Sequence, residues 1–86
     1  MSRALTVSRT TIPASERARY LDRLKARAAH YGRANCKFWV YEEAGLRGAF
    51  VEFTEADDAA TLSAAHASSP EPILDSARIY QPVELH

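Results

Sequence analysis

The sequence has a single cysteine, Cys36, so an intrachain disulfide is excluded. A lone thiol is typical of a reducing compartment, and we expect a cytoplasmic protein. Eleven basic residues balance eleven acidic ones, so no excess positive charge points to nucleic acid or an anionic membrane as a partner. No apolar run is long enough to span a bilayer, and residues 1–10 lack the apolar segment of a secretory signal.

Motifs that would identify a reaction are also missing. The chain has no glycine-rich phosphate loop, no nucleophile elbow and no paired-carboxylate motif. Its three histidines and Cys36 lack the spacing of metal ligands, so we expect neither a metal nor a cofactor. What is present is an ordinary globular composition, 47% hydrophobic and 26% charged. The length allows one domain, residues 1–86.

The first third of the chain predicts a strand followed by a helix. Residues 4–12 are rich in Thr, Val and Ile, and the strand should end before Pro13, which cannot donate a ladder hydrogen bond. Residues 15–31 carry apolar side chains at a helical period. Arg27 falls with the other charged residues on the solvent side, and Gly32 is expected just after the helix end. The predicted buried stripe is Tyr20, Leu21, Leu24, Ala28 and Tyr31.

The rest of the chain predicts a β-hairpin at 36–53, a helix at 54–67 and a last strand at 77–84, which Pro82 makes an edge strand. The order β-α-β-β-α-β is that of the ferredoxin-like α+β fold, a four-stranded antiparallel sheet with two helices on one face. The second helix should be capped by Thr54 or Asp57. Its expected buried stripe is Ala59, Leu62, Ala65 and His66.

Both faces of the predicted hairpin are apolar. Because side chains alternate along a strand, one face carries Trp39, Tyr41, Val51 and Phe53 and the other carries Phe38, Val40 and Phe50. The sequence leaves open which set lies under the helices, since a one-residue shift in register exchanges them.

The face that the helices leave bare should measure about 400 Å², which is more apolar surface than most monomers expose. Pairing two such faces would contribute roughly 20 kcal/mol, at about 25 cal/mol per Å², against an association cost of about 4–15 kcal/mol. We therefore expect a homodimer joined through the open face of the sheet.

The run from TTIPASERARYLDRLKARAAHYG through FWVYEEAGLRGAFVEFTEADDAATLSAAHA resembles the dimeric α/β-barrel superfamily in element order and hydrophobic pattern. That group includes antibiotic-biosynthesis-type and heme-degrading monooxygenases, and its ligands usually lie between the sheet and its helices. The heme-degrading members use an Asn on the first strand, a Trp on the third and a His on the second helix. Here His66 matches, but Trp39 lies on the second strand and the first strand has no Asn, so heme degradation is not expected.

The resemblance implies a site between sheet and helices. His66 is the predicted catalytic residue, because an imidazole with a pKa near neutrality can accept a proton; the alternative is a structural histidine bonded to backbone or water. An aromatic small molecule is the expected ligand, and the alternative role for the aromatic residues is packing in the core or dimer interface. The predicted substrate-binding residues are Arg9, Tyr20, Leu24, Trp39, Tyr41 and Leu62, with Phe38 as the alternative to Trp39.

Two charged strand residues have two interpretations each. An inward-facing Arg9 can bind an anionic oxygen and an inward-facing Glu52 can act as a base with a raised pKa, or either can form an edge or interface ion pair. Cys36 is expected to be a small buried hydrophobe, and His30 an exposed residue at the helix end.

Two function classes stay open. One is a cofactor-independent monooxygenase or isomerase acting on an aromatic or polyketide-like compound, and the other is a non-catalytic structural or ligand-binding dimer. An open cavity with a polar group on apolar walls would favour the first, and a space filled by side chains the second.

Overall fold

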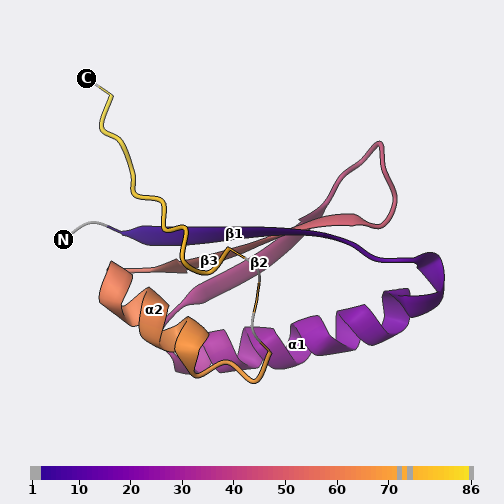
Figure 1. Ribbon diagram of the computed structural model, residues 1–86, viewed down its shortest axis with the longest axis horizontal. Coiled ribbons are helices and arrows are strands. Elements are labelled where there is room, and N and C mark those ends of the chain that lie inside the picture. Colours follow the sequence, from indigo (N-terminus) through magenta and orange to yellow (C-terminus); the bar gives the residue numbers. More distant parts are fainter. Residues whose placement is uncertain (1–2, 72, 74, 86) are drawn as a thin grey trace.

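The computed structural model describes residues 3–71, 73 and 75–85. Along the chain it forms β1 (Ala4–Thr11), the 3₁₀ turn η1 (Ala14–Glu16), α1 (Arg17–Arg33), β2 (Lys37–Glu42), β3 (Ala49–Ala56) and α2 (Ala59–Ala67). The three strands form one antiparallel sheet in the order β1-β3-β2. Both helices lie on one face of this sheet (Figure 1), so the fold is α+β with a covered and an open sheet face.

The strand register decides which hairpin face lies under the helices. Phe50 is buried and stands opposite Glu42 in the β2–β3 ladder, whereas Tyr41 is 62% exposed. Phe38, Val40 and Phe50 therefore belong to the covered face. The opposite, open face carries Leu5, Val7, Trp39, Tyr41, Val51 and Phe53, together with the charged residues Arg9, Lys37 and Glu55.

Helix α1 turns a different stripe inward from the one predicted. Arg27 is buried, while Leu21 is 38% exposed and Ala28 is also exposed. The reason is electrostatic: Arg27 has a buried carboxylate partner on the sheet, Glu52, which a periodicity argument does not take into account. The prediction of Leu21 and Ala28 as core residues is wrong, and so is that of Arg27 on the solvent side. The buried residues of α1 are Tyr20, Arg27 and Tyr31.

The helix ends also differ from the prediction. Gly32 lies inside α1, and the left-handed residue after the helix is Asn35, with φ 63°. A short polar side chain such as that of Asn tolerates this conformation.

The second helix starts five residues later than predicted. Residues 54–56 extend β3 instead, where Ala56 pairs with Ala4 of β1. The cap is Asp58, whose carboxylate accepts a hydrogen bond of 2.7 Å from the backbone N–H of Thr61. Leu62 and Ala65 are buried as predicted, and Ala59 and His66 are partly buried.

The predicted last strand at 77–84 is reduced to one bridge. Tyr80 exchanges two backbone hydrogen bonds with Leu5 of β1, of 2.8 and 2.9 Å. The ladder does not continue, and Pro82, which has no N–H to donate, follows two residues later. Residues 81–85 are exposed and lead away from the body of the protein (Figure 1). The sheet thus has three strands and not the four predicted.

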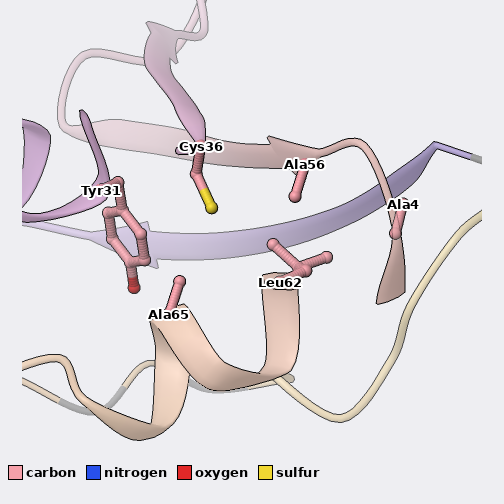
Figure 2. Close-up of a cluster of buried hydrophobic side chains, with 6 residues drawn as sticks. All are labelled: Ala4, Tyr31, Cys36, Ala56, Leu62 and Ala65. Carbon is pink, nitrogen blue, oxygen red and sulfur yellow. The ribbon is translucent and has the colours of Figure 1, made fainter. Parts of the chain in front are cut away.

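A small core lies between α2 and the covered face. Figure 2 shows Cys36, Tyr31 and Leu62 directed into this space, with alanines around them. Cys36 is buried with its thiol in this core, as predicted for a small hydrophobe. The cluster is Ala4, Tyr31, Cys36, Ala56, Leu62 and Ala65. Among the described residues, no helix has both the length and the apolarity required to cross a bilayer.

Candidate functional site

The layer between sheet and helices holds buried polar side chains. Five polar or charged residues are almost fully buried there, from β1, β3 and α1. Three of the five take part in two hydrogen-bonded groups: Thr6 in the His66 cluster (His66, Tyr31 and Thr6), and Arg27 and Glu52 in the Glu52 cluster (Glu52, Arg27 and Tyr20). The buried polar residues are Thr6, Ser8, Arg27, Glu52 and Thr54.

In the His66 cluster, both imidazole nitrogens are already occupied. Nδ1 lies 2.8 Å from the Tyr31 hydroxyl, and Nε2 lies 2.7 Å from the Thr6 hydroxyl. Burial, and secondarily the charge of His30, lowers the pKa of His66. The neutral ring has one donor and one acceptor nitrogen, and a hydroxyl can serve either. The arrangement is that of a structural histidine whose hydrogen-bonding capacity is used within the protein.

His30 contributes to the same end of the layer. It was expected in solvent, but it is partly buried and its Nε2 lies 2.9 Å from the carbonyl oxygen of Ala65. This bond ties α1 to α2, so the prediction of an exposed His30 is wrong because α2 packs over the end of α1.

The Glu52 cluster is a buried ion pair with a third partner. The two terminal nitrogens of Arg27 donate to the two carboxylate oxygens of Glu52 at 2.7 and 2.9 Å, and the Tyr20 hydroxyl donates to one of them at 2.6 Å. The side chains of Arg27 and Glu52 are 7% and 4% exposed. Such bidentate, charge-assisted bonds are among the strongest in proteins. They fix α1 against β3 in one orientation.

Tyr20 is held in its protonated form. Burial, followed by its hydrogen bond to Glu52, raises the pKa of Tyr20 well above its usual range. The phenol therefore acts as a donor to Glu52 and not as a base. Tyr20 and Arg27 are seven residues apart, which is two helical turns, so α1 presents both to the same carboxylate.

A cavity of about 170 Å³ adjoins the Glu52 cluster. Its walls come from β1, β3, α1 and the loop after α2, where the carboxylate of Glu71 lies 3.8 Å from Nε of Arg23 and 3.9 Å from Nε of Arg27. His66 does not line it. The lining residues are Ser8, Arg9, Thr10, Ile12, Tyr20, Arg23, Arg27, Glu52, Glu71 and Ile73.

A larger hollow of about 640 Å³ lies at the hairpin end of the sheet. Two acidic residues, Glu42 and the exposed Glu43, line it. Glu42 is already bound by Arg17 at 2.7 and 2.8 Å and by the backbone N–H of Gly48 at 2.8 Å. These bonds lower the pKa of Glu42 to about 2, and the bond from Arg17 has the largest effect. This carboxylate links the hairpin to the start of α1. Because it is already bonded, the 640 Å³ hollow is less suited than the 170 Å³ cavity to bind a ligand.

The open face carries an aromatic cluster. Trp39 stacks on Phe53 with ring centroids 5.4 Å apart, and Tyr41 meets the edge of Phe53 at 5.8 Å. Charged side chains border it, including Lys37 and the ion pair between Arg3 and Glu55. An apolar centre with a charged border is the composition of a protein interface.

The structure separates the residues that the sequence predicted as one site. Tyr20 lines the 170 Å³ cavity, and the exposed Arg9 borders it but also lines the 640 Å³ hollow together with Tyr41. Leu62 lies in the core under α2 with His66 beside it on the helix, and Leu24 is half-buried on α1. The predicted substrate-binding residues Trp39 and Tyr41 lie on the opposite, open face.

Sequence reasoning missed Arg27 and Glu71. Glu52 was considered as an inward-facing group, and its parity with the buried Phe50 and Thr54 is a usable signal, because a buried carboxylate requires a basic partner. Arg27, seven residues after an inward Tyr20, is then the obvious donor. No comparable signal marks Glu71, which lies in a loop.

Comparisons with known protein families, with curated proteins and with solved structures find no match for this chain. Within residues 3–71, 73 and 75–85, no three His, Cys, Asp or Glu side chains are grouped so that they could hold a metal ion. The geometry above is what a functional proposal must rest on.

Proposed function

We propose that the protein is a homodimer joined through the open faces of its sheets, with a small-molecule cavity between sheet and α1 in each protomer. The sequence resemblance to the dimeric α/β-barrel superfamily supports both parts of this proposal. On this view the protein has a ferredoxin-like protomer and binds a small aromatic compound.

The observation that carries the dimer is the apolar open face. Six of its side chains are large and apolar or aromatic, and Arg9 stands among them opposite Val51. Tyr41 is 62% exposed, and the other five apolar residues are partly exposed. An antiparallel sheet that faces water normally carries polar residues on that side. A second copy supplies the matching apolar surface, because a two-fold axis brings the same patch of two molecules together.

The Leu5–Tyr80 bridge supports a fourth strand beside β1. In the order Tyr80 segment, β1, β3, β2, neighbouring strands are antiparallel, as the ferredoxin-like order requires. We propose that the 77–84 segment extends this pairing when the sheet is held in a dimer.

Between the two function classes, ligand binding without catalysis has the better support. The predicted base, His66, uses both nitrogens on Tyr31 and Thr6. The cavity lies instead beside a carboxylate that is already neutralised by Arg27. A cofactor-independent monooxygenase or isomerase is the second candidate, because Glu52 gives the cavity one acid–base group.

The dimer is tested by sedimentation at micromolar concentration. We expect the wild type to sediment as two copies and Tyr41→Asp as one, because a buried, unpaired charge opposes association. Leu46→Asp is the matched control: Leu46 is 54% exposed at the hairpin tip, outside the open face. A single wild-type copy, or equal behaviour of the two variants, would contradict the proposed interface.

Catalysis is tested separately. The protein is incubated in air with a panel of phenols and hydroquinones, and quinone formation is followed by absorbance. Turnover above the buffer rate would establish an enzyme. Its loss in Glu52→Gln or His66→Ala identifies the base only where circular dichroism shows that the variant is folded under the assay conditions, because Glu52→Gln also removes the counter-charge of the buried Arg27. Rates equal to those of buffer support the non-catalytic dimer.

A further inference from the structure

We propose that the 170 Å³ cavity binds a small carboxylic acid with a benzene-sized apolar body, whose carboxylate takes the place of that of Glu71 beside Arg23 and Arg27. This names the ligand class for the small-molecule site of the proposed function and rests on it.

The first observation is a buried donor without an acceptor. Both terminal nitrogens of Arg27 are engaged by Glu52, while its Nε–H is buried and has no hydrogen-bond partner among the described residues. Glu71 is the nearest carboxylate recorded, but at 3.9 Å it is too far for a hydrogen bond. Buried donors are almost always paired in native proteins. The missing partner is an acceptor, and an anionic one binds most strongly.

The second observation is the charge of the cavity wall. The guanidinium groups of Arg23 and Arg27 stand against the carboxylates of Glu52 and Glu71, so the formal charge is +2 − 2 = 0, and it becomes +1 when Glu71 turns away. Arg9 also borders the cavity, but its place opposite Val51 puts its side chain on the open face. Glu52 is fully used by Arg27 and Tyr20. Glu71 is different: its side chain is 43% exposed and touches both arginines only at ion-pair distance. Its carboxylate can turn into water, which leaves the two Nε–H groups to a ligand.

The third observation is the size and apolarity of the remaining walls. A cavity of about 150 Å³ accepts benzene, and this one measures about 170 Å³. Ile12, Ile73 and the ring of Tyr20 line it, and that ring is supported by Phe50 at 4.7 Å. The volume suits one ring with a carboxylate, and it is too small for a nucleotide or a long acyl chain.

Benzoate is the probe, and benzamide is its neutral isostere. The measurement is a calorimetric titration, combined with the NMR signal of the Arg27 Nε–H group. We expect benzoate to bind more tightly than benzamide and to shift that signal, which a carboxylate bonded directly to Nε must do.

The matched variants test the displacement of Glu71. Glu71→Gln should tighten benzoate binding about three- to tenfold, because two weak ion pairs no longer compete, and leave benzamide unchanged. Glu16→Gln, an exposed glutamate paired only to a neighbouring arginine on its own segment, is the control. Arg23→Gln should weaken benzoate by a similar factor, whereas Arg19→Gln on the exposed side of α1 should not.

The outcomes separate the two proposals. If benzamide binds as tightly as benzoate in the wild type and in Glu71→Gln, the carboxylate assignment is wrong and the small-molecule cavity remains. If neither compound binds, even in Glu71→Gln, then both the ligand class and the cavity as a binding site are refuted. If benzoate binds but neither Glu71→Gln nor Arg23→Gln alters its affinity, the ligand lies elsewhere and this inference fails.

Discussion

The two faces of the sheet are unlike in a way that reverses the usual pattern. The covered face is rich in polar groups, with Thr6, Ser8, Glu52 and Thr54 all buried under the helices. The open face carries the larger apolar side chains, Trp39 and Phe53 among them. In a sheet that faces water on one side, the apolar residues normally lie on the covered face.

The difference in polarity between the two faces indicates which kind of surface each face packs against. Each side chain in the two clusters of the covered face has a specific partner on a helix or strand, as Glu52 has in Arg27 and Tyr20, although the Nε–H of Arg27 is left without one among the described residues. Such bonds fix one arrangement of helices on the sheet, since an unpaired buried polar group is costly. The apolar side chains of the open face need no such partners, and they can pack against a second apolar surface.

The largest effect is expected from Glu52→Gln on the covered face. The change leaves the buried guanidinium of Arg27 without its counter-charge, which should lower the free energy of unfolding by about 3–5 kcal/mol. The measurement is urea denaturation at one fixed protomer concentration. The double variant Arg27→Met with Glu52→Leu should recover most of the loss, because it removes both charges together.

Glu55→Gln is the control for this prediction, since Glu55 lies on the same strand but faces the other way and pairs with the exposed Arg3. Its effect should stay within about 0.5 kcal/mol. An equal loss in Glu52→Gln and Glu55→Gln would mean that the covered face does not depend on its buried pair.

The next effect is expected on the open face. Val51→Thr combined with Phe53→Thr places β-branched side chains, which favour strands, at both positions but removes apolar surface. We expect the dissociation constant of the proposed dimer to rise about a hundredfold or more, since buried aromatic residues dominate interfaces. A dilution series in the ultracentrifuge measures it. Retention of a tight dimer in this variant would place the interface elsewhere.

The contrast between the faces marks the limit of what the sequence alone could predict. Alternation along 36–53 predicted the two sets of side chains correctly, because it depends only on strand geometry. Which of the two sets lies under the helices depends on how α1 packs on the sheet, and that packing involves the buried Arg27. Helical periodicity predicts that Arg27 faces solvent. Its burial follows from its ion pair with Glu52, which lies 25 residues further along the chain.

The same reasoning explains the other differences. Residues 54–56 have acidic and threonine side chains that suit a helix start, yet pairing with β1 holds them in β3. Strand 77–84 was predicted from local composition, but the edge of β1 accepts a single bridge there. The separation of His66 from Trp39 and Tyr41 follows from which face each residue occupies, and that could not be read from the residues themselves.

A smaller effect is expected when the covered face is titrated at His66. Because the folded state lowers the pKa of His66 below 6.5, the unfolded chain binds a proton first as the pH falls. Stability from this group is therefore present above pH 6.5 and declines below it. The groups around the ring are the hydroxyls of Thr6 and Tyr31 and the imidazole of His30, and none is a carboxylate that would stabilise the charged form.

The test compares wild type and His66→Gln by urea denaturation between pH 7.5 and about 5.5. The wild type should lose stability over this range and His66→Gln should lose less of it. The dimer dissociation constant should stay the same, since His66 lies under the helices. If the wild type became more stable on acidification, the folded protein would favour the protonated form of His66. The interpretation of His66 as a buried neutral ring would then be wrong.

The smallest effect is expected at the sheet end, where Glu42 meets Arg17 and Gly48. The pKa of this carboxyl is about 2 in the folded protein, against an ordinary value of 4.5, so its stabilising contribution is complete above pH 4.5 and is lost as the pH falls towards 2. Denaturation of wild type and Glu42→Gln across that range should converge at the acid end, because protonation removes the same charge as the substitution. Glu43→Gln, an exposed neighbour, is the control.

Glu42 is more accessible than Glu52, so screening by solvent keeps its effect below that of the buried pair. A loss in Glu42→Gln as large as that in Glu52→Gln would remove the distinction between a buried ion pair that orients α1 and an accessible one that fastens its first turn.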